Sequence, residues 1–335
     1  MNIADYKGVW VFAEQRDGHL QKVALELLGK GREIADKIGV ELTAILLGDN
    51  IDEIANELVA YGADRVLYAH NPLLKHYTTD AYTKVICDLA KERKPEIILV
   101  GASFIGRDLG PRVSARLGTG LTADCTALDT EEGTNHLLMT RPAFGGNLMA
   151  TIMCTEHRPQ MSTVRPGVFE KLAKDTSRKG KVEKIAAKVE ASDIRTKVED
   201  VAKIAKNIAD IGEAEVLVSG GRGLGDKENF GMLKELADLM GGSIAGSRAA
   251  IDSGWLDKAY QVGQTGKTVR PKIYIAVGIS GAIQHLAGMQ DSDFIIAINK
   301  DESAPIMQIA DLGIVGDFKK IIPELIAQIK VAQAE

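Results

Sequence analysis

The sequence is poor in aromatic residues and cysteine, and it has no long apolar segment. Its three cysteines, Cys87, Cys125 and Cys154, are far apart, and none stands at metal-ligand spacing from a histidine or another cysteine. We therefore expect three small thiols in apolar surroundings and no metal or iron–sulfur centre. No apolar run approaches the roughly 18 residues that a membrane-spanning helix needs, so no membrane insertion is predicted.

A concentrated excess of basic residues is missing as well. The chain has 41 Lys and Arg against 46 Asp and Glu, which gives a net charge of -5. Nucleic-acid binding depends on clustered positive charge, so this balance argues against such a partner. Residues 1–7 contain no basic stretch followed by an apolar core, and we expect a cytoplasmic protein.

The chain does contain a regular alternation of strand-like and helix-like stretches, and its 335 residues suit two α/β domains. In the first half this alternation predicts a doubly wound domain whose parallel sheet is covered on both faces. The predicted strands are 9–13, 42–47, 65–68 and 97–100, and the predicted helices lie near 21–38, 51–61 and 78–92. Segment 101–110 then either seats an anion at a helix N-terminus or is a tight turn capped by Ser103.

After residue 121 the pattern changes to short strands separated by turn residues. The runs 125–128, 137–140, 149–154 and 161–164 predict antiparallel hairpins added to the first domain. Arg141-Pro-Ala-Phe-Gly-Gly146 is either a specialised loop or only a hairpin corner. Residues 171–207 are rich in charge, so we interpret them as a solvated linker with room for one strand and no binding role. We place the domains at 1–200 and 201–335.

The second domain resumes the α/β alternation, with strands predicted at 215–219, 243–245, 272–277 and 294–298. Polar clusters interrupt the apolar runs where strands should end: Gln261-Val-Gly-Gln-Thr-Gly-Lys267, Gly278-Ile-Ser-Gly-Ala-Ile-Gln-His285 and Ile298-Asn-Lys300. Ligands bind at strand ends in open α/β sheets, and glycines let backbone amides approach a phosphate. A dinucleotide is therefore the expected ligand. Gly220-Gly-Arg-Gly-Leu-Gly225 also follows a strand but lacks G-x-G-x-x-G spacing.

Several segments, in order, carry a resemblance to a known family. They include the three clusters above, Ser219-Gly-Gly-Arg-Gly223, Gly246-Ser-Arg248 and Asp311-Leu-Gly-Ile-Val-Gly-Asp317, with segments 141–146 and 163–167 in the first domain. Over its whole length the chain closely resembles the α subunits of electron transfer flavoproteins. Its opening, Tyr6-Lys-Gly-Val-Trp-Val-Phe-Ala-Glu-Gln-Arg16, resembles the anaerobic bacterial, electron-bifurcating members.

The resemblance implies a fold, a cofactor and partners. The first domain is expected to be adenine-nucleotide-hydrolase-like and to dock a β subunit in a heterodimer, and the second to be a Rossmann-like domain that binds FAD. The expected redox partners are an acyl-CoA or butyryl-CoA dehydrogenase and, in the bifurcating members, ferredoxin or flavodoxin. The positions expected to line the FAD are Arg222, Ser247, Arg248, Gln261, Val262, Gly263, Gln264, Thr265, Ser280, Gly281, Ala282, Ile283, Gln284, His285, Asn299, Asp317 and Phe318.

Three of these residues are implied to lie near the flavin ring: Thr265 at N5, His285 at the C2 carbonyl and Arg248 over or beside the ring. They would tune the one-electron potential and act as neither acid nor base, so no catalytic residue is predicted. Each has a structural alternative. His285 can be a satisfied core histidine, Arg248 can pair with Asp252, and Phe318 can belong to the core.

The sequence leaves more than one function open. A bifurcating electron carrier, an ordinary carrier that delivers electrons to a quinone reductase, and an enzyme that binds NAD or an adenine nucleotide all fit a nucleotide site at strand ends. The last would need a general acid or base beside a substrate pocket, and the sequence offers no His–Asp or paired-carboxylate arrangement for that role.

Overall fold

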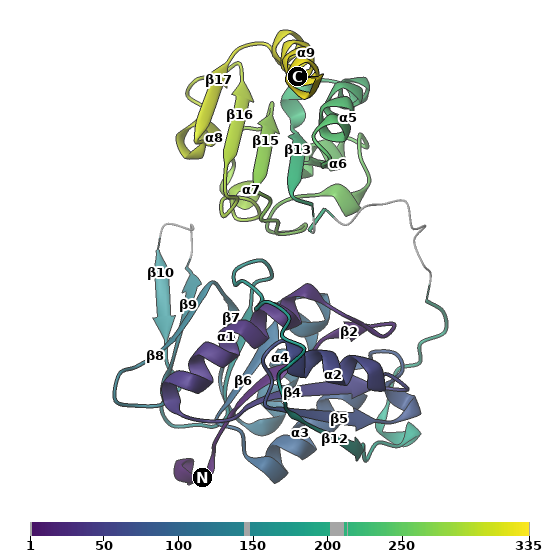
Figure 1. Cartoon of the computed structure of the whole chain (residues 1–335), viewed down its shortest axis with the longest axis vertical. Helices are drawn as coiled ribbons and strands as arrows, with labels where there is room; N and C mark the ends of the chain where they lie inside the picture. The colour runs from purple at the N-terminus through teal and green to yellow at the C-terminus, as the bar shows by residue number, and fades with distance from the viewer. Residues whose placement is uncertain (1, 144–147, 202–210, 213, 335) are drawn as a thin grey trace. The chain divides into compact units, whose positions relative to one another are not determined.

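The computed structural model describes residues 2–143, 148–201, 211–212 and 214–334. It contains two compact units, Met1–Val201 and Ala202–Glu335, and each is built on its own parallel sheet (Figure 1). The predicted α/β class is confirmed. Within the described ranges, no helix combines the length and the apolar character that crossing a membrane requires.

Unit 1 has a seven-stranded parallel sheet in the order β12-β5-β4-β1-β6-β11-β7. The four strands predicted in the first half all form. The sheet comprises β1 (Val9–Phe12), β4 (Leu42–Gly48), β5 (Arg65–His70), β6 (Ile97–Gly101), β7 (Leu121–Cys125), β11 (Gln160–Val164) and β12 (Lys181–Ala186), and a small hairpin joins β2 (Gln15–Arg16) to β3 (His19–Leu20). Strands β4 and β6 are buried along their whole length, which explains why they contain almost only apolar residues.

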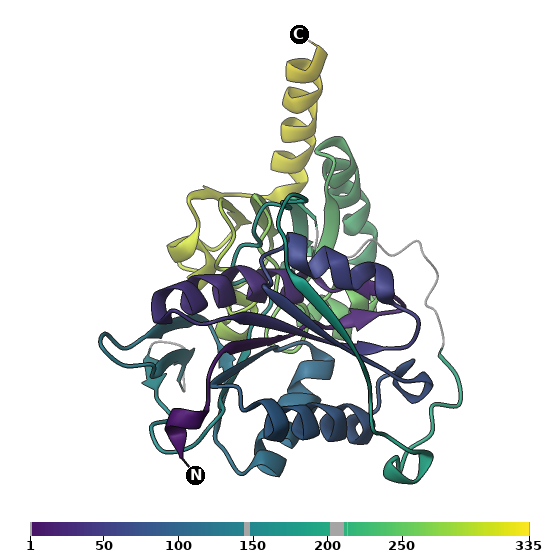
Figure 2. The same cartoon turned by 60° about the horizontal axis from the view of Figure 1, so that its bottom comes forward.

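Helices cover both faces of this sheet (Figure 2). One face packs against α1 (Lys22–Ile38) and α2 (Asp52–Ala60), and the other against α3 (Thr79–Arg93) and α4 (Phe104–Leu117). Leu27 and Leu28, whose spacing predicted the inner face of α1, are fully buried. The doubly wound arrangement predicted for this domain is therefore confirmed.

A separate three-stranded antiparallel sheet carries the predicted hairpins. It consists of β8 (Ala127–Thr130), β9 (Leu137–Pro142) and β10 (Met149–Ile152). Residues 144–147, which include the second half of the predicted loop 141–146, lie outside the described residues. The prediction was wrong for 161–164, because these residues form β11, which pairs in parallel with β6 and β7 inside the main sheet.

The charged stretch 171–207 is only partly a linker. Its one strand, β12, extends the main sheet by pairing with β5. Ion pairs fix neighbouring residues to the same unit: Arg178 bonds Asp64 at 2.9 Å, and Arg195 bonds Asp80 at 2.7 Å. Val189 is buried in the core between them. The strand that the interpretation allowed does form, but the interpretation of the rest as a solvated linker is wrong between residues 178 and 195.

The cysteines divide into two classes. Cys87 and Cys125 are buried, and burial raises the pKa of their thiols to about 11 and about 12. Cys154 is only partly buried, so the expectation of three enclosed thiols was wrong for this residue.

Unit 2 has five parallel strands in the order β14-β13-β15-β16-β17. They are β13 (Val216–Gly220), β14 (Ser243–Gly246), β15 (Ile273–Val277), β16 (Ile295–Asn299) and β17 (Leu312–Val315). One face packs on α5 (Phe230–Leu239) and α9 (Phe318–Ala334); the remaining short helices are α6 (Arg248–Asp252), α7 (Ile283–Leu286) and α8 (Pro305–Ile309). Because all five strands are parallel, their carboxyl ends share one edge, which we call the carboxyl edge of unit 2.

Candidate FAD site at the carboxyl edge of unit 2

The structure brings every predicted polar cluster to the carboxyl edge of unit 2. Arg222 follows β13, Ser247 and Arg248 follow β14, and segment 280–285 follows β15. Asn299 is the last residue of β16, and Asp317 comes two residues after β17. The strand order reverses between β14-β13 and β15, so the ends of β13 and β15 form the topological switch point where ligands bind in open sheets.

The segment 261–267 joins this edge through main-chain hydrogen bonds. Val262 N–H donates to the Gly246 carbonyl at 2.9 Å, and Gln264 N–H donates to the Gln284 carbonyl at 2.7 Å. The buried Gln261 amide donates to the Thr265 hydroxyl oxygen at 2.9 Å. Since that oxygen accepts this bond, the Thr265 hydroxyl proton remains available to a ligand.

The loop after β15 carries main-chain donors that the protein does not use. Within the part of the chain that the structure describes, the amides of Ser280, Gly281, Ala282 and Ile283 donate no hydrogen bond. Gly278 and Gly281 have positive φ values of 62° and 85°, a backbone conformation that also occurs in anion-binding nests. The helix that follows this loop, α7, starts at Ile283 and is one turn long.

The glycines around the switch point serve a different purpose from the predicted one. A Cβ at Gly221 would lie 2.2 Å from the Gly278 carbonyl oxygen, and one at Gly281 would lie 2.3 Å from the Ile306 nitrogen. Moreover, the amides of Gly221 and Gly223 donate to the carbonyls of Val277 and Gly278, both at 2.9 Å. These glycines therefore let loops pack on one another. The amides of Gly221 and Gly223 are used within the protein, whereas that of Gly281 is one of the four unpaired amides.

The side chains of Asn299 and Asp317 are engaged within the protein. Asn299 donates to the Ile279 carbonyl at 2.9 Å, which fixes the loop after β15 to the end of β16. Asp317 accepts from Lys319 N–H at 3.0 Å and pairs with Lys300 at 3.2 Å. The backbone hydrogen bond from Lys319, together with Lys300, holds the pKa of Asp317 below its usual range. Both residues thus shape the edge itself.

Two predicted residues follow their structural alternatives. Phe318 is 5% exposed and packs in the core under α5 and α9, so its side chain does not line the carboxyl edge. Arg248 lies 3.4 Å from Asp252, and both side chains are more than half exposed. An exposed ion pair of this kind contributes little to stability, so the Arg248 side chain can leave Asp252 and move toward a ligand.

His285 is buried, as its structural alternative anticipated, and is not exposed at the edge. It is 7% exposed, and its Nε2 lies 3.0 Å from the hydroxyl of Tyr274, a fully buried residue of β15. Burial lowers the pKa of His285 to about 4, so the imidazole is neutral at pH 7. No pattern in the sequence indicates this partner, because Tyr274 stands in an apolar strand where an aromatic residue is ordinarily core.

Comparison with known proteins decides the family. Residues 9–190 match the electron transfer flavoprotein domain, and residues 210–290 match the electron transfer flavoprotein FAD-binding domain. An electron transfer flavoprotein subunit alpha from Clostridium acetobutylicum is 69% identical over 99% of both chains. The chain belongs to the electron transfer flavoprotein α-subunit family.

Other relatives in this family bear more specific names. The acryloyl-CoA reductase electron transfer subunit beta of Anaerotignum propionicum is 51% identical, with 98% of this chain and 97% of that protein covered. The lactate dehydrogenase (NAD(+),ferredoxin) subunit LctC of Acetobacterium woodii is 45% identical over 97% of this chain and 77% of its own length.

The residues at the carboxyl edge fit the FAD that this family binds. The four unpaired amides between Ser280 and Ile283 suit an anionic pyrophosphate. Arg222, exposed at the end of β13, can oppose the same charge, and within the described residues its guanidinium makes no ion pair. The Thr265 hydroxyl proton and the exposed Arg248 are free for the rest of the cofactor. When bound, FAD supplies one-electron oxidation and reduction.

Unit 1 presents no comparable site at the N-terminus of α4. The Ser103 hydroxyl accepts from Gly106 N–H at 3.0 Å and donates to the carboxylate of Glu14, which is 1% exposed. The capped-turn interpretation of segment 101–110 is therefore confirmed, and the capping hydroxyl is itself bonded to a buried carboxylate.

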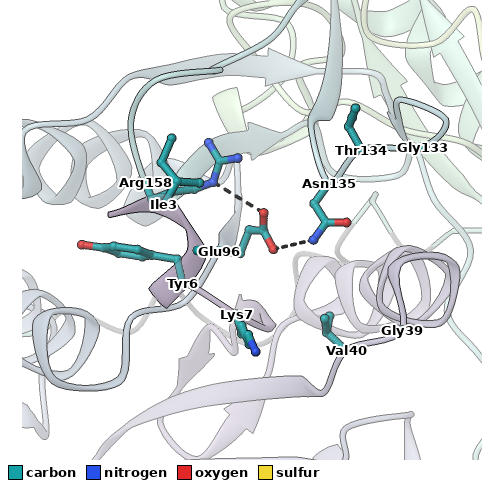
Figure 3. A pocket seen from close by; sticks show the side chains of 11 residues that line it. Ile3, Tyr6, Lys7, Gly39, Val40, Glu96, Gly133, Thr134, Asn135 and Arg158 are labelled. Carbon is teal, nitrogen blue, oxygen red and sulfur yellow. Dashed lines mark hydrogen bonds and ion pairs between the residues drawn. The ribbon is translucent and has the colours of Figure 1, made fainter. Parts of the chain in front are cut away.

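A pocket of about 560 Å³ lies instead at the amino ends of the strands of unit 1 (Figure 3). Figure 3 shows Glu96 at its centre, with Arg158 and Asn135 converging on the carboxylate. Asn135 donates to Glu96 at 3.1 Å, and the Arg158 guanidinium lies 3.5 Å away. Burial raises the pKa of Glu96, although both partners oppose that shift. This pocket lies at the amino edge of the sheet. In open α/β proteins ligands bind at the opposite, carboxyl edge.

Proposed function

We propose that this chain carries the flavin through which single electrons pass to an acyl-CoA dehydrogenase in the cytoplasm, within a heterodimer with a β subunit. The observation that carries the proposal is the carboxyl edge of unit 2, where unpaired amides and two exposed arginines meet in a domain of the FAD-binding family. An electron carrier needs cofactor contacts and no organic substrate pocket.

The acid–base chemistry expected of a hydride-transferring enzyme finds no support at this edge. Among the residues that the structure describes, the histidine–carboxylate pairs are His70–Asp49 and His136–Glu131, and both lie in unit 1. His285 is neutral at pH 7 and is hydrogen-bonded to Tyr274, whose pKa burial raises. These groups favour a role in setting a cofactor's surroundings over proton transfer to a substrate.

We further infer the bifurcating mode. NADH would deliver its electron pair to a second FAD in the β subunit, one electron would pass to ferredoxin or flavodoxin, and the other would pass through this chain to a butyryl-CoA-type dehydrogenase. Support comes from the names of two relatives, one an NAD(+)- and ferredoxin-linked lactate dehydrogenase subunit and the other an acryloyl-CoA reductase electron transfer subunit. The opening segment 6–16, which resembles anaerobic bacterial members, agrees with this mode.

The test is to co-produce the chain with its β subunit, count FAD in the purified complex and measure NADH-dependent ferredoxin reduction. We expect two FAD per heterodimer, and ferredoxin reduction only when crotonyl-CoA and butyryl-CoA dehydrogenase are both present. One FAD, with no response to NADH, would identify an ordinary carrier that serves a quinone reductase. A complex that binds no flavin would refute the electron-carrier proposal itself.

Unit 1 is proposed to dock the β subunit through the sheet that contains β10. Among the described residues this strand pairs with β9 alone, and large apolar side chains around it are exposed by 40–68%: Leu148, Met149, Ile152 and Met153. Exposed apolar side chains gathered on an unpaired strand edge are typical of a protein interface. Ile152→Lys should weaken the heterodimer, whereas Val182→Lys, a matched change on β12 at the edge of the main sheet, should not. Equal effects of the two would argue against this surface.

A further inference from the structure

The β9–β10 hairpin, which carries the proposed docking surface, is fastened to unit 1 at its base. Both strands belong to the separate antiparallel sheet, and among the described residues no strand of the main sheet pairs with them. Met149 and Ile152 lie on opposite faces of β10 and are both exposed, so the packing of β10 does not fix its own orientation. The contacts at the base of the hairpin therefore have to orient it.

Gln160, the first residue of β11, holds the start of the hairpin. It is 0% exposed, and its side chain makes two hydrogen bonds to the backbone. Its Oε1 accepts from the N–H of Leu137, the first residue of β9, at 2.8 Å, and its Nε2 donates to the Asn135 carbonyl, also at 2.8 Å. A side-chain amide thus pairs with the start of β9 as a neighbouring strand would.

Arg158 and Glu96 hold the end of the same hairpin. Arg158 is buried, and its Nη1 donates at 3.0 Å to the carbonyl of Cys154, which comes two residues after β10. The guanidinium also lies 3.5 Å from the buried Glu96 carboxylate, which accepts from the Asn135 side chain at 3.1 Å (Figure 3). Both ends of the hairpin therefore meet at one buried cluster, which we call the base clamp: Glu96, Arg158 and Gln160.

Apolar packing alone does not set the direction in which the hairpin points. Leu137 and Met139 of β9 are buried in the core of unit 1, but the free energy of such burial does not depend on direction. Buried hydrogen bonds are directional, and an arrangement that breaks them leaves donors or acceptors unpaired at a cost. The base clamp therefore selects one orientation among those that bury the same apolar side chains.

We propose that the base clamp orients β10 for the β subunit, so that Glu96, Arg158 and Gln160 are positioning residues for heterodimer formation although all three are buried. This inference rests on the proposed function, in which β10 docks the β subunit. The exposed apolar side chains of β10 match a partner surface in one orientation of the hairpin. A hairpin that samples other orientations has a smaller binding-competent fraction, and the dissociation constant rises by the reciprocal of that fraction.

The experiment follows the dissociation of the FAD-loaded heterodimer on dilution. Gln160→Met keeps a similar volume but removes both hydrogen-bonding groups, and it should raise the dissociation constant about tenfold if the hairpin keeps the binding orientation about one tenth of the time. Hydrogen exchange should show that the amides of β9 and β10 lose protection while those of β4 and β6 keep it. The control is Tyr82→Phe, which removes a buried hydroxyl that donates to the Leu74 carbonyl, and it should leave both readouts unchanged.

The outcomes separate this inference from the docking proposal. An unchanged dissociation constant in Ile152→Lys would refute the docking surface itself. A weakened Ile152→Lys complex, with a wild-type constant in Gln160→Met, would overturn the inference and leave the docking surface standing. Equal rises in Gln160→Met and Tyr82→Phe would also overturn it, because general destabilisation would then be the cause. If Gln160→Met fails to fold, Asn135→Ala decides, because it changes an exposed residue and removes one bond to Glu96: a constant raised about two- to fivefold supports the clamp, and an unchanged one overturns it.

Discussion

Gly281 offers the sharpest test of how the carboxyl edge of unit 2 is built. Its φ of 85° lies in the left-handed region, and a Cβ there would lie 2.3 Å from the Ile306 nitrogen and 2.7 Å from its Cα. Gly281→Ala therefore adds a conformational cost of about 1–2 kcal/mol and an overpacking cost of about 1–3 kcal/mol. The loop must also move away from Ile306, whose N–H donates to the Ser280 carbonyl, which costs about 1 kcal/mol more.

Gly241→Ala is the matched control. Gly241 also has a positive φ, 66°, but no atom lies within 4 Å of the position of its Cβ. Gly241→Ala should lower the free energy of unfolding only by the conformational cost, about 1–2 kcal/mol. Gly281→Ala should lower it by about 3–6 kcal/mol. Denaturant unfolding of the FAD-loaded complex, followed by the fluorescence of released flavin, measures both. Equal losses for the two variants would refute the steric reasoning, and undiminished FAD binding by Gly281→Ala would refute the placement of the unpaired amides at the cofactor.

Three further predictions concern unit 1. Ser103→Ala should destabilise unit 1 by about 1–2 kcal/mol, because it removes the cap of α4. Thr78→Ala, at an N-cap whose side chain makes no capping bond, should change the stability little. Thermal unfolding compares the two variants, and equal shifts in melting temperature would contradict the capping argument. The hydrogen bond from Arg195 lowers the pKa of Asp80 to about 2, so the stability it contributes is present above the ordinary carboxyl pKa and is lost as pH falls toward 2. NMR titration should find a higher value in Arg195→Ala, and an unchanged value would exclude the pair as the cause. A thiol reagent at pH 8 should modify Cys154 first in the native protein, because burial keeps the other two thiols protonated; mass spectrometry showing three equal rates would contradict this.

The sequence was sufficient where local pattern and burial agree. Strands such as β4 and β6 are enclosed on both faces, so their composition alone marks them. Two strands depend on distant partners: β11, whose pairing was predicted wrongly, and β12, which was expected without defined bounds. β11 pairs with β6, about 60 residues earlier, and sequence adjacency to the hairpins concealed this pairing. β12 is an edge strand rich in charge, and Glu183 on it pairs with both Arg65 and Arg93.

The sequence predicted which residues lie at the candidate site but not the role of each one. Strand-end clusters pointed to the carboxyl edge because parallel topology brings strand ends together. The glycine pattern could not distinguish glycines that let loops pack from those that free an amide for a ligand, since both need the same absence of a side chain. Likewise, nothing in an apolar strand indicates that Tyr274 faces a histidine, because that contact depends on the path of a later loop.

The two units show why one chain with two doubly wound sheets is expected to hold one nucleotide. In unit 1 the switch point lies between β1 and β6, and there the buried Glu14 accepts from Ser103 and pairs with Arg16 at 2.9 Å. An incoming phosphate would be repelled by the negative charge of this carboxylate beside the capping Ser103, which opposes the attraction of the helix dipole. At the switch point of unit 2 the described residues place unpaired amides from Ser280 to Ile283, and Arg222 lies nearby. The groups at the switch point, and not the sheet around it, therefore favour unit 2 as the one that binds the cofactor.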